Sequence, residues 1–199
     1  LREFAKQMEW SHHDLAYVLH DAANNLEALA EHFTDEDVRS RFYNLAETQE
    51  GLFTQTQAQE AGLTPVITRF IEAGYIKEVR PGIFRLVNFP TTEYEHLTIL
   101  WLWSQQQGVF SHETALQLWE LSDVLTRKIH ITLPTHLEQF NILPPGDKVE
   151  IYYSDVPSHK RSWPANVPAT NPARTLNDGA RRHFSPELLQ QALRQGISK

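Results

Sequence analysis

The chain has 199 residues, of which 41% are hydrophobic and 11% aromatic, and its formal net charge is -7. Such a composition supports one large or two small globular domains and excludes disorder as the default. The sequence contains no cysteine, which excludes disulfides, thiolate catalysis and cysteine-ligated zinc. Because it also has no long apolar run and no secretory leader, we expect a cytoplasmic protein.

Acidic side chains gather at the start of the chain, where residues 1–47 hold ten of the 25 acidic residues and four of the 18 basic ones. Apolar residues at three- and four-residue steps predict one amphipathic helix over residues 11–33 and a second over residues 35–45. We expect these helices to form a hairpin. Three roles are open to this acidic extension: masking a basic surface, dimerisation and solubility.

The next segment, residues 48–90, is built from shorter units. Thr54 and Thr64 are each expected to cap a short helix, and a glycine ends each of the two. Two β-prone runs then flank an Arg-Pro-Gly turn at residues 80–82. Helix, turn, helix and hairpin in this order predict a winged helix-turn-helix.

The second of these helices has one apolar face and one polar, partly basic face, which suits the major groove of DNA. Cations in the hairpin can contact phosphates or enter the minor groove. The predicted DNA-binding residues are Thr64, Thr68, Arg69, Lys77, Arg80 and Arg85. Because the segment carries four basic and four acidic side chains, a protein-binding or purely structural role stays open beside DNA binding.

Residues 91–199 mix helices and strands without regular βαβ alternation, so the whole chain is predicted to be α+β, with an N-terminal helical hairpin, a winged helix-turn-helix and a mixed C-terminal domain. Ser111 and Thr114 have the spacing of a helix capping box, and we interpret His112 and Glu113 between them as structural. The predicted elements are helices at residues 93–107 and 112–119, strands at 129–133 and 149–153, and helices beginning after Asn171 and Ser185, the last ending at Gly196.

No pattern indicates catalysis. Ser122, His130 and Asp178 supply the residue types of a hydrolytic triad, but no Gly-x-Ser-x-Gly elbow presents the serine. Metal-dependent cleavage would call for a Glu-x-Lys beside an acidic pair, and the sequence has no Glu-x-Lys. His12 and His20 are two helical turns apart, too far to share a metal ion. We therefore predict no enzymatic activity, metal or cofactor.

A second basic cluster lies towards the C-terminus. The seven-residue spacing of Arg174 and Arg181 predicts that they share one side of a helix. We interpret the cluster either as a solvated face or as a second surface for DNA, RNA or an acidic partner. Its members are Lys160, Arg161, Arg174, Arg181 and Arg182.

Three segments resemble the AbiE family of abortive-infection type IV antitoxins. The first, residues 51–89, reads GLFTQTQAQEAGLTPVITRFIEAGYIKEVRPGIFRLVNF. The second, residues 109–134, reads VFSHETALQLWELSDVLTRKIHITLP, and the third, residues 171–182, reads NPARTLNDGARR. The match is most distinctive over SHETAL and the LSD that follows it.

The resemblance implies an N-terminal winged helix that represses its own operon by binding double-stranded operator DNA. It also implies a C-terminal domain that neutralises a toxin similar to a nucleotidyltransferase, without need of a stable complex. A homodimer would double the DNA-binding surface. The expected division is an extension at residues 1–47, a winged helix at 48–90 and an antitoxin-like domain at 91–199. The DNA-binding half of an endonuclease-like protein is the rival interpretation.

Overall fold

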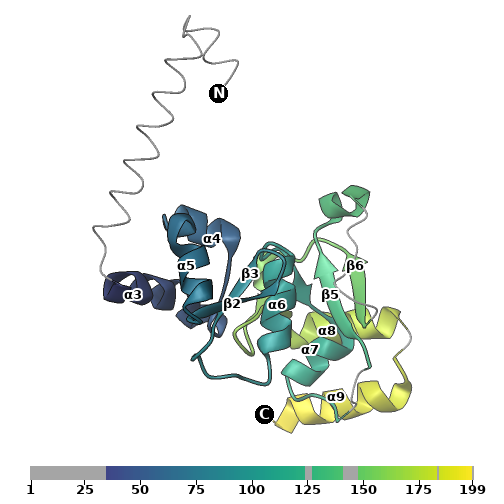
Figure 1. Ribbon diagram of the computed structural model, residues 1–199. Coiled ribbons are helices and arrows are strands. Elements are labelled where there is room, and N and C mark those ends of the chain that lie inside the picture. The colour runs from purple at the N-terminus through teal and green to yellow at the C-terminus, as the bar shows by residue number, and fades with distance from the viewer. Residues whose placement is uncertain (1–34, 124–126, 141–147, 183, 199) are drawn as a thin grey trace, which may run out of the picture. The chain divides into compact units, whose positions relative to one another are not determined.

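The computed structural model describes residues 35–123, 127–140, 148–182 and 184–198 (Figure 1). The chain divides into two compact units, residues 1–89 and residues 90–199, and each is described by itself. Both units combine helices with a β-sheet, so the predicted α+β class is confirmed. The helix predicted over residues 11–33, with its histidines, lies outside the described residues. None of the described helices is long and apolar enough to cross a membrane.

The first unit has a three-stranded sheet in the order β1-β3-β2, in which β3 is antiparallel to both neighbours. The hairpin strands β2 and β3 lie within one residue, at each end, of the β-prone runs of the sequence, residues 75–79 and 83–87. The elements in chain order are α3 (Asp35–Ala46), η1 (Glu47–Gln49), β1 (Leu52–Thr54), α4 (Gln55–Glu60), η2 (Thr64–Val66), α5 (Ile67–Glu72), β2 (Ile76–Arg80) and β3 (Ile83–Leu86).

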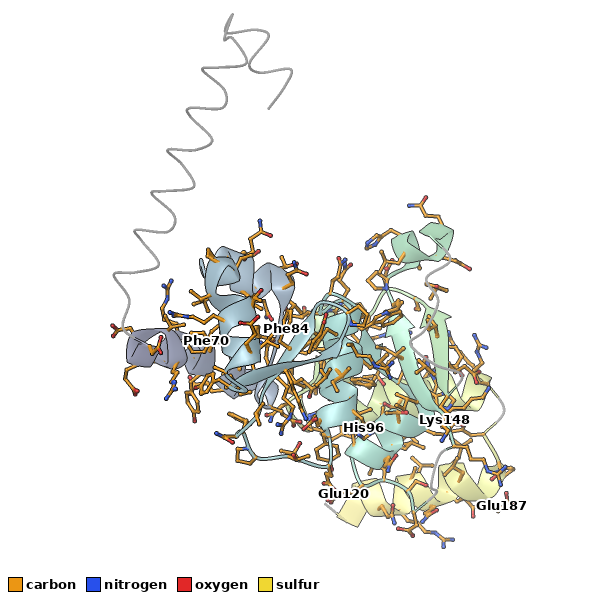
Figure 2. The ribbon with its side chains drawn as sticks, in the orientation of Figure 1. Phe70, Phe84, His96, Glu120, Lys148 and Glu187 are labelled. Carbon is orange, nitrogen blue, oxygen red and sulfur yellow. The ribbon has the colours of Figure 1, made fainter. Side chains whose placement is uncertain are left out.

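Phenylalanine rings form the centre of the first unit (Figure 2). The ring of Phe42 on α3 lies 5.4 Å from that of Phe53 and 5.3 Å from that of Phe70, centroid to centroid. Phe53 also stacks on Phe84 at 5.5 Å. Burial of such rings is the main stabilising contribution to a small unit like this one.

The predicted boundary between residues 47 and 48 is therefore wrong for α3. Its acidic composition suggested a separate extension, but the apolar stripe of Val38, Phe42 and Ala46 is buried in the same core as the sheet. The four-residue spacing of these side chains gives the helix one dry face, and that face decides where the helix packs. Its acids remain on the exposed side.

Of the helix caps predicted in the first unit, one is confirmed and one is wrong. The Thr54 capping box is confirmed: the hydroxyl accepts from the Gln57 amide at 3.1 Å, and the Gln57 side chain accepts from the Thr54 amide at 2.8 Å. The Thr64 cap is wrong, because Thr64 is the first residue of η2, whose N-cap is Leu63, and the Thr64 carbonyl accepts from the Ile67 amide within that 3₁₀ turn. Gly51 has a φ of 78°, and a Cβ there would lie 2.4 Å from Cγ of Phe89, so only glycine fits.

The second unit is built on a five-stranded mixed sheet in the order β6-β5-β4-β8-β7. β5 is parallel to β6, β4 is antiparallel to β5 and parallel to β8, and β7 is antiparallel to β8. The elements are α6 (Glu95–Trp103), β4 (Val109–Phe110), α7 (His112–Leu118), β5 (Ile129–Leu133), η3 (Thr135–Phe140), β6 (Val149–Tyr153), η4 (Ser158–Lys160), β7 (Arg161–Ser162), β8 (Ala169–Thr170), α8 (Pro172–Arg181) and α9 (Pro186–Ser198).

The two strands predicted in this unit, residues 129–133 and 149–153, are confirmed at both ends. The helix predicted over residues 93–107 ends earlier, at Trp103, because Gln105 and Gln106 take left-handed backbone conformations that a helix does not allow. The cap of α8 is confirmed, since the Asn171 side chain accepts from the amide of Arg174 at 2.9 Å.

Candidate functional site

The segment from η2 to α5 has one buried and one exposed side. Ile67 and Phe70 are buried in the core of the first unit, whereas Thr64, Thr68 and Arg69 are exposed. Because the apolar residues recur at three-residue spacing, the intervening polar side chains must point away from the core. Three predicted DNA-binding side chains are thus accessible on one short stretch of chain.

Arg69 has an acidic partner. Its Nη2 lies 3.0 Å from Oδ1 of Asp35, the first residue of α3, and the two side chains are 54% and 65% exposed. An ion pair this exposed contributes about 0–1 kcal/mol, because water and salt screen it. Asp35 therefore pairs with the Arg69 guanidinium but leaves it exposed to solvent, so another anion can displace the Asp35 carboxylate.

The β2–β3 hairpin exposes Lys77 and Arg80. At its tip, the amide of Gly82 donates to a carboxylate oxygen of Glu78 at 2.8 Å. This bond fixes the turn. The hairpin therefore offers accessible positive charge together with a shaped tip.

The prediction that Arg85 contacts DNA is wrong, because the residue is only 3% exposed. Its guanidinium donates to the carbonyls of Leu86 at 2.8 Å, Val87 at 3.3 Å and Phe89 at 2.8 Å. The physical reason is the place of β3 in the sheet. As the central strand it is buried along its whole length, so neither of its faces opens to solvent.

The prediction of a second basic surface is also wrong in part, because it included Arg174. Nε of Arg174 lies 2.6 Å from Oδ2 of Asp178, and both side chains are mostly buried, at 15% and 11% exposure. Arg174 also donates to the hydroxyl of Ser154 at 3.2 Å. Arg174 and Asp178 lie one helical turn apart on α8, and we interpret their ion pair as structural. Exposed cations remain at Arg161, Arg181 and Arg182, while Lys160 is half-buried.

A set of polar residues gathers between α7 and the edge of the sheet, and the sequence did not predict it as a set. We call it the polar cluster and define it as His112, Glu113, His130, Glu150 and Tyr152. The Tyr152 hydroxyl donates to Glu150 at 2.9 Å and lies 3.0 Å from Nδ1 of His130. Nε2 of His130 lies 3.3 Å from Glu113, and the ring of His112 stacks on that of Tyr152 at 4.0 Å.

The capping box predicted at Ser111 is wrong, because its side chain makes no capping bond. Its hydroxyl instead accepts from Thr132 at 2.8 Å and lies 2.9 Å from Nδ1 of His112. The hydroxyl of Thr114 accepts from the His130 amide at 2.8 Å. Both hydroxyls therefore bind the neighbouring strand β5, a long-range contact that a local motif cannot reveal.

Burial dominates the electrostatics of the polar cluster. It lowers the pKa of His112 to about 4, against an opposing attraction from Asp178. Burial and the hydrogen bond to Glu150 raise the pKa of Tyr152, and bonds from Lys128 and Tyr152 lower the pKa of Glu150. At neutral pH the cluster thus holds an uncharged imidazole, an uncharged phenol and a carboxylate.

This arrangement does not form a hydrolytic site. Ser111 beside His112 is fully buried, so a substrate cannot reach its hydroxyl. His130 bonds with Tyr152 and Glu113, while Asp178 bonds with Arg174, so the structure does not bring them together with Ser122 as a triad. Within the described ranges, no three His, Asp or Glu side chains are grouped to hold a metal ion.

No family model matches the sequence, and no curated protein matches it. Among solved structures, the chain is similar to the crystal structure of the RV2827C protein from Mycobacterium tuberculosis, with 17% identity and a TM-score of 0.47. The alignment covers 75% of this chain and 62% of that chain, so the chain spans less than two thirds of that protein. A similarity this distant assigns neither a family nor a function.

Proposed function

We propose that the first unit is a winged helix-turn-helix that binds double-stranded DNA, and that the protein is a transcriptional autoregulator of the type IV antitoxin class. The observation that carries the proposal is the exposed polar side of η2 and α5, followed along the chain by a hairpin with two exposed cations. α4 supplies the first helix, α5 the second, and β2 with β3 the wing.

In this proposal, α5 lies in the major groove with Thr64, Thr68 and Arg69 towards the DNA. The hydroxyls suit base edges or phosphates, and the arginine suits guanine or phosphate. Lys77 and Arg80 contact the neighbouring backbone as point charges. Arg85 has no part in the interface, since it stabilises the hairpin from inside.

Binding requires the Arg69–Asp35 pair to open. A phosphate offers the guanidinium a stronger, two-pronged contact than the single 3.0 Å contact that Asp35 provides. Because the pair is exposed, opening it costs at most about 1 kcal/mol. The acidic start of α3 thus weakens DNA binding without preventing it.

The test is a salt titration of binding to the DNA immediately upstream of the gene. We expect affinity to fall steeply with salt and the double variant Arg69→Gln/Arg80→Gln to bind at least about tenfold more weakly, with the slope of log K against log salt reduced by roughly 2. Arg194→Gln, which removes an exposed cation from α9, is the matched control. Wild-type affinity in the double variant would refute this interface.

The autoregulatory role has its own test. We expect a gene for a nucleotidyltransferase-like toxin beside this one, and co-expression of the present chain should restore growth without a stable complex between the two proteins. Light scattering of the protein–DNA complex measures whether a homodimer binds. No binding of wild-type protein to any duplex at low salt would instead support a protein-interaction module, and DNA cleavage would support the endonuclease-like alternative.

A further inference from the structure

A cavity of about 360 Å³ lies in the second unit, between the helices α6 and α7 and the first residues of the strands β5 and β6. This volume falls within the range of small-molecule sites. The cavity is separate from the proposed DNA interface, which belongs to the first unit. The side chains that matter for its chemistry are Tyr94, His96, Leu97, Arg127, Lys128 and Lys148.

Strand pairing explains why cations meet at this cavity. β5 and β6 are parallel, with Ile129 beside Val149, and the amide of Ile129 donates to the carbonyl of Lys148 at 2.7 Å. The residues that precede the two strands therefore lie at the same end of the sheet. This register brings Arg127 and Lys128 next to Lys148, and α6 contributes His96 to the same cavity. His96 and Lys148 are labelled in Figure 2.

The lining is positive although the whole chain has a formal net charge of -7. Three permanent cations face one carboxylate, Glu93, and a hydrogen bond from the Tyr94 phenol engages that carboxylate. Lys128 is held by Glu150 at 3.0 Å. Arg127 and Lys148 are both exposed, and neither forms an ion pair with another residue of the described ranges.

One wall of the cavity is apolar. Leu97 on α6 and Leu118 on α7 are buried and line it, and the ring of Tyr94 is half-buried beside them. An aromatic ring and two leucines suit a flat, weakly polar group, which packs against them at little cost in ordering. The cavity therefore combines an anion-binding end with an apolar wall.

We propose that this cavity binds a small phosphate ester with a planar ring, of the size of a nucleoside monophosphate. The phosphate contacts Arg127 and Lys148, since a planar guanidinium and an ammonium suit a dianion. The ring packs against Tyr94 and Leu97. Lys128 stays with Glu150, which joins the cavity to the polar cluster through the Tyr152 hydroxyl.

Titration calorimetry with the full chain tests the proposal, with AMP, GMP, CMP and UMP as probes and with adenosine and inorganic phosphate as comparisons. We expect saturable binding of at least one nucleotide at a single site. Arg127→Gln/Lys148→Gln should weaken that binding at least tenfold, whereas Arg194→Gln should leave it unchanged. Both substituted side chains of the double variant are exposed, so a circular-dichroism melt should match that of the wild type.

Two results would overturn the proposal: no saturable heat with any of the four nucleotides, or equal binding by the wild type and the double variant. Inorganic phosphate binding as tightly as the best nucleotide would refute the role of the apolar wall. The result is independent of DNA binding, because the two sites lie in different units. Arg69→Gln/Arg80→Gln should bind the nucleotide with wild-type affinity.

Discussion

The two units place their polar side chains in opposite ways. Among the described residues, the first unit buries only Gln49, Glu50 and Arg85 of its polar side chains, and its other cations are exposed except for the half-buried Arg41. The second unit buries a bonded set of histidine, hydroxyl and carboxylate groups between its sheet and helices. The first unit is thus an apolar support for an outer polar surface, while the second draws stability from polar contacts inside it.

In the first unit, Gly51→Ala is expected to cause the largest loss of stability. The left-handed backbone and the overlap with Phe89 should together cost about 4 kcal/mol of unfolding free energy. Amide hydrogen exchange in residues 35–89 measures this loss. Gly74→Ala is the matched control, because its φ is also positive, at 69°, but nothing lies within 4 Å of the added methyl group. Equal losses in both variants would mean that the contact with Phe89 is unimportant.

For the second unit, the corresponding test is Arg174→Met. Removing one partner of a mostly buried ion pair leaves Asp178 without its charge partner and should cost about 3 kcal/mol. Tryptophan fluorescence during urea unfolding reports it, since four of the five tryptophans lie in this unit. Arg181→Met on the exposed side of α8 should cost less than about 0.5 kcal/mol. A small loss in both would place Arg174 on the surface after all.

The pH dependence of stability should also separate the units. The pKa of His112 falls from 6.5 when unfolded to about 4 when folded, so the unfolded state binds more protons between these values. The second unit should therefore lose on the order of 3 kcal/mol as the pH falls from 6.5 to 4. His112→Asn should flatten that slope, and His159→Asn, at an exposed position, should not. An unchanged slope in His112→Asn would contradict the buried neutral imidazole.

The smallest expected effect concerns the acidic start of α3. Asp35→Asn removes the carboxylate that pairs with Arg69 and should tighten DNA binding two- to threefold at low salt, about 0.5 kcal/mol. Fluorescence anisotropy with a labelled duplex measures the gain. Glu36→Gln removes the same charge one residue along, so an equal gain there would show general repulsion in place of a specific pair.

Local patterns in the sequence predicted what depends on neighbours along the chain. The strands at residues 129–133 and 149–153 and the caps at Thr54 and Asn171 were right because each signal is contained within a few residues. The role of Arg85 could not be predicted, since it depends on which strand is central. The polar cluster could not be predicted for a similar reason. Its histidines and its tyrosine come from segments that only the pairing of β5 with β6 and the packing of α7 bring together.

Arg85 also shows how the first unit closes. After β3 ends at Leu86, the chain turns, and the carbonyls of residues 86, 87 and 89 accept from one guanidinium. One side chain thus donates to three backbone carbonyls at the end of β3. Arg85 therefore fixes the path of the chain as it leaves the sheet, although its positive charge alone would suggest a place on the surface. Any search for DNA-contacting arginines in hairpins of this kind should first ask which strand lies in the middle.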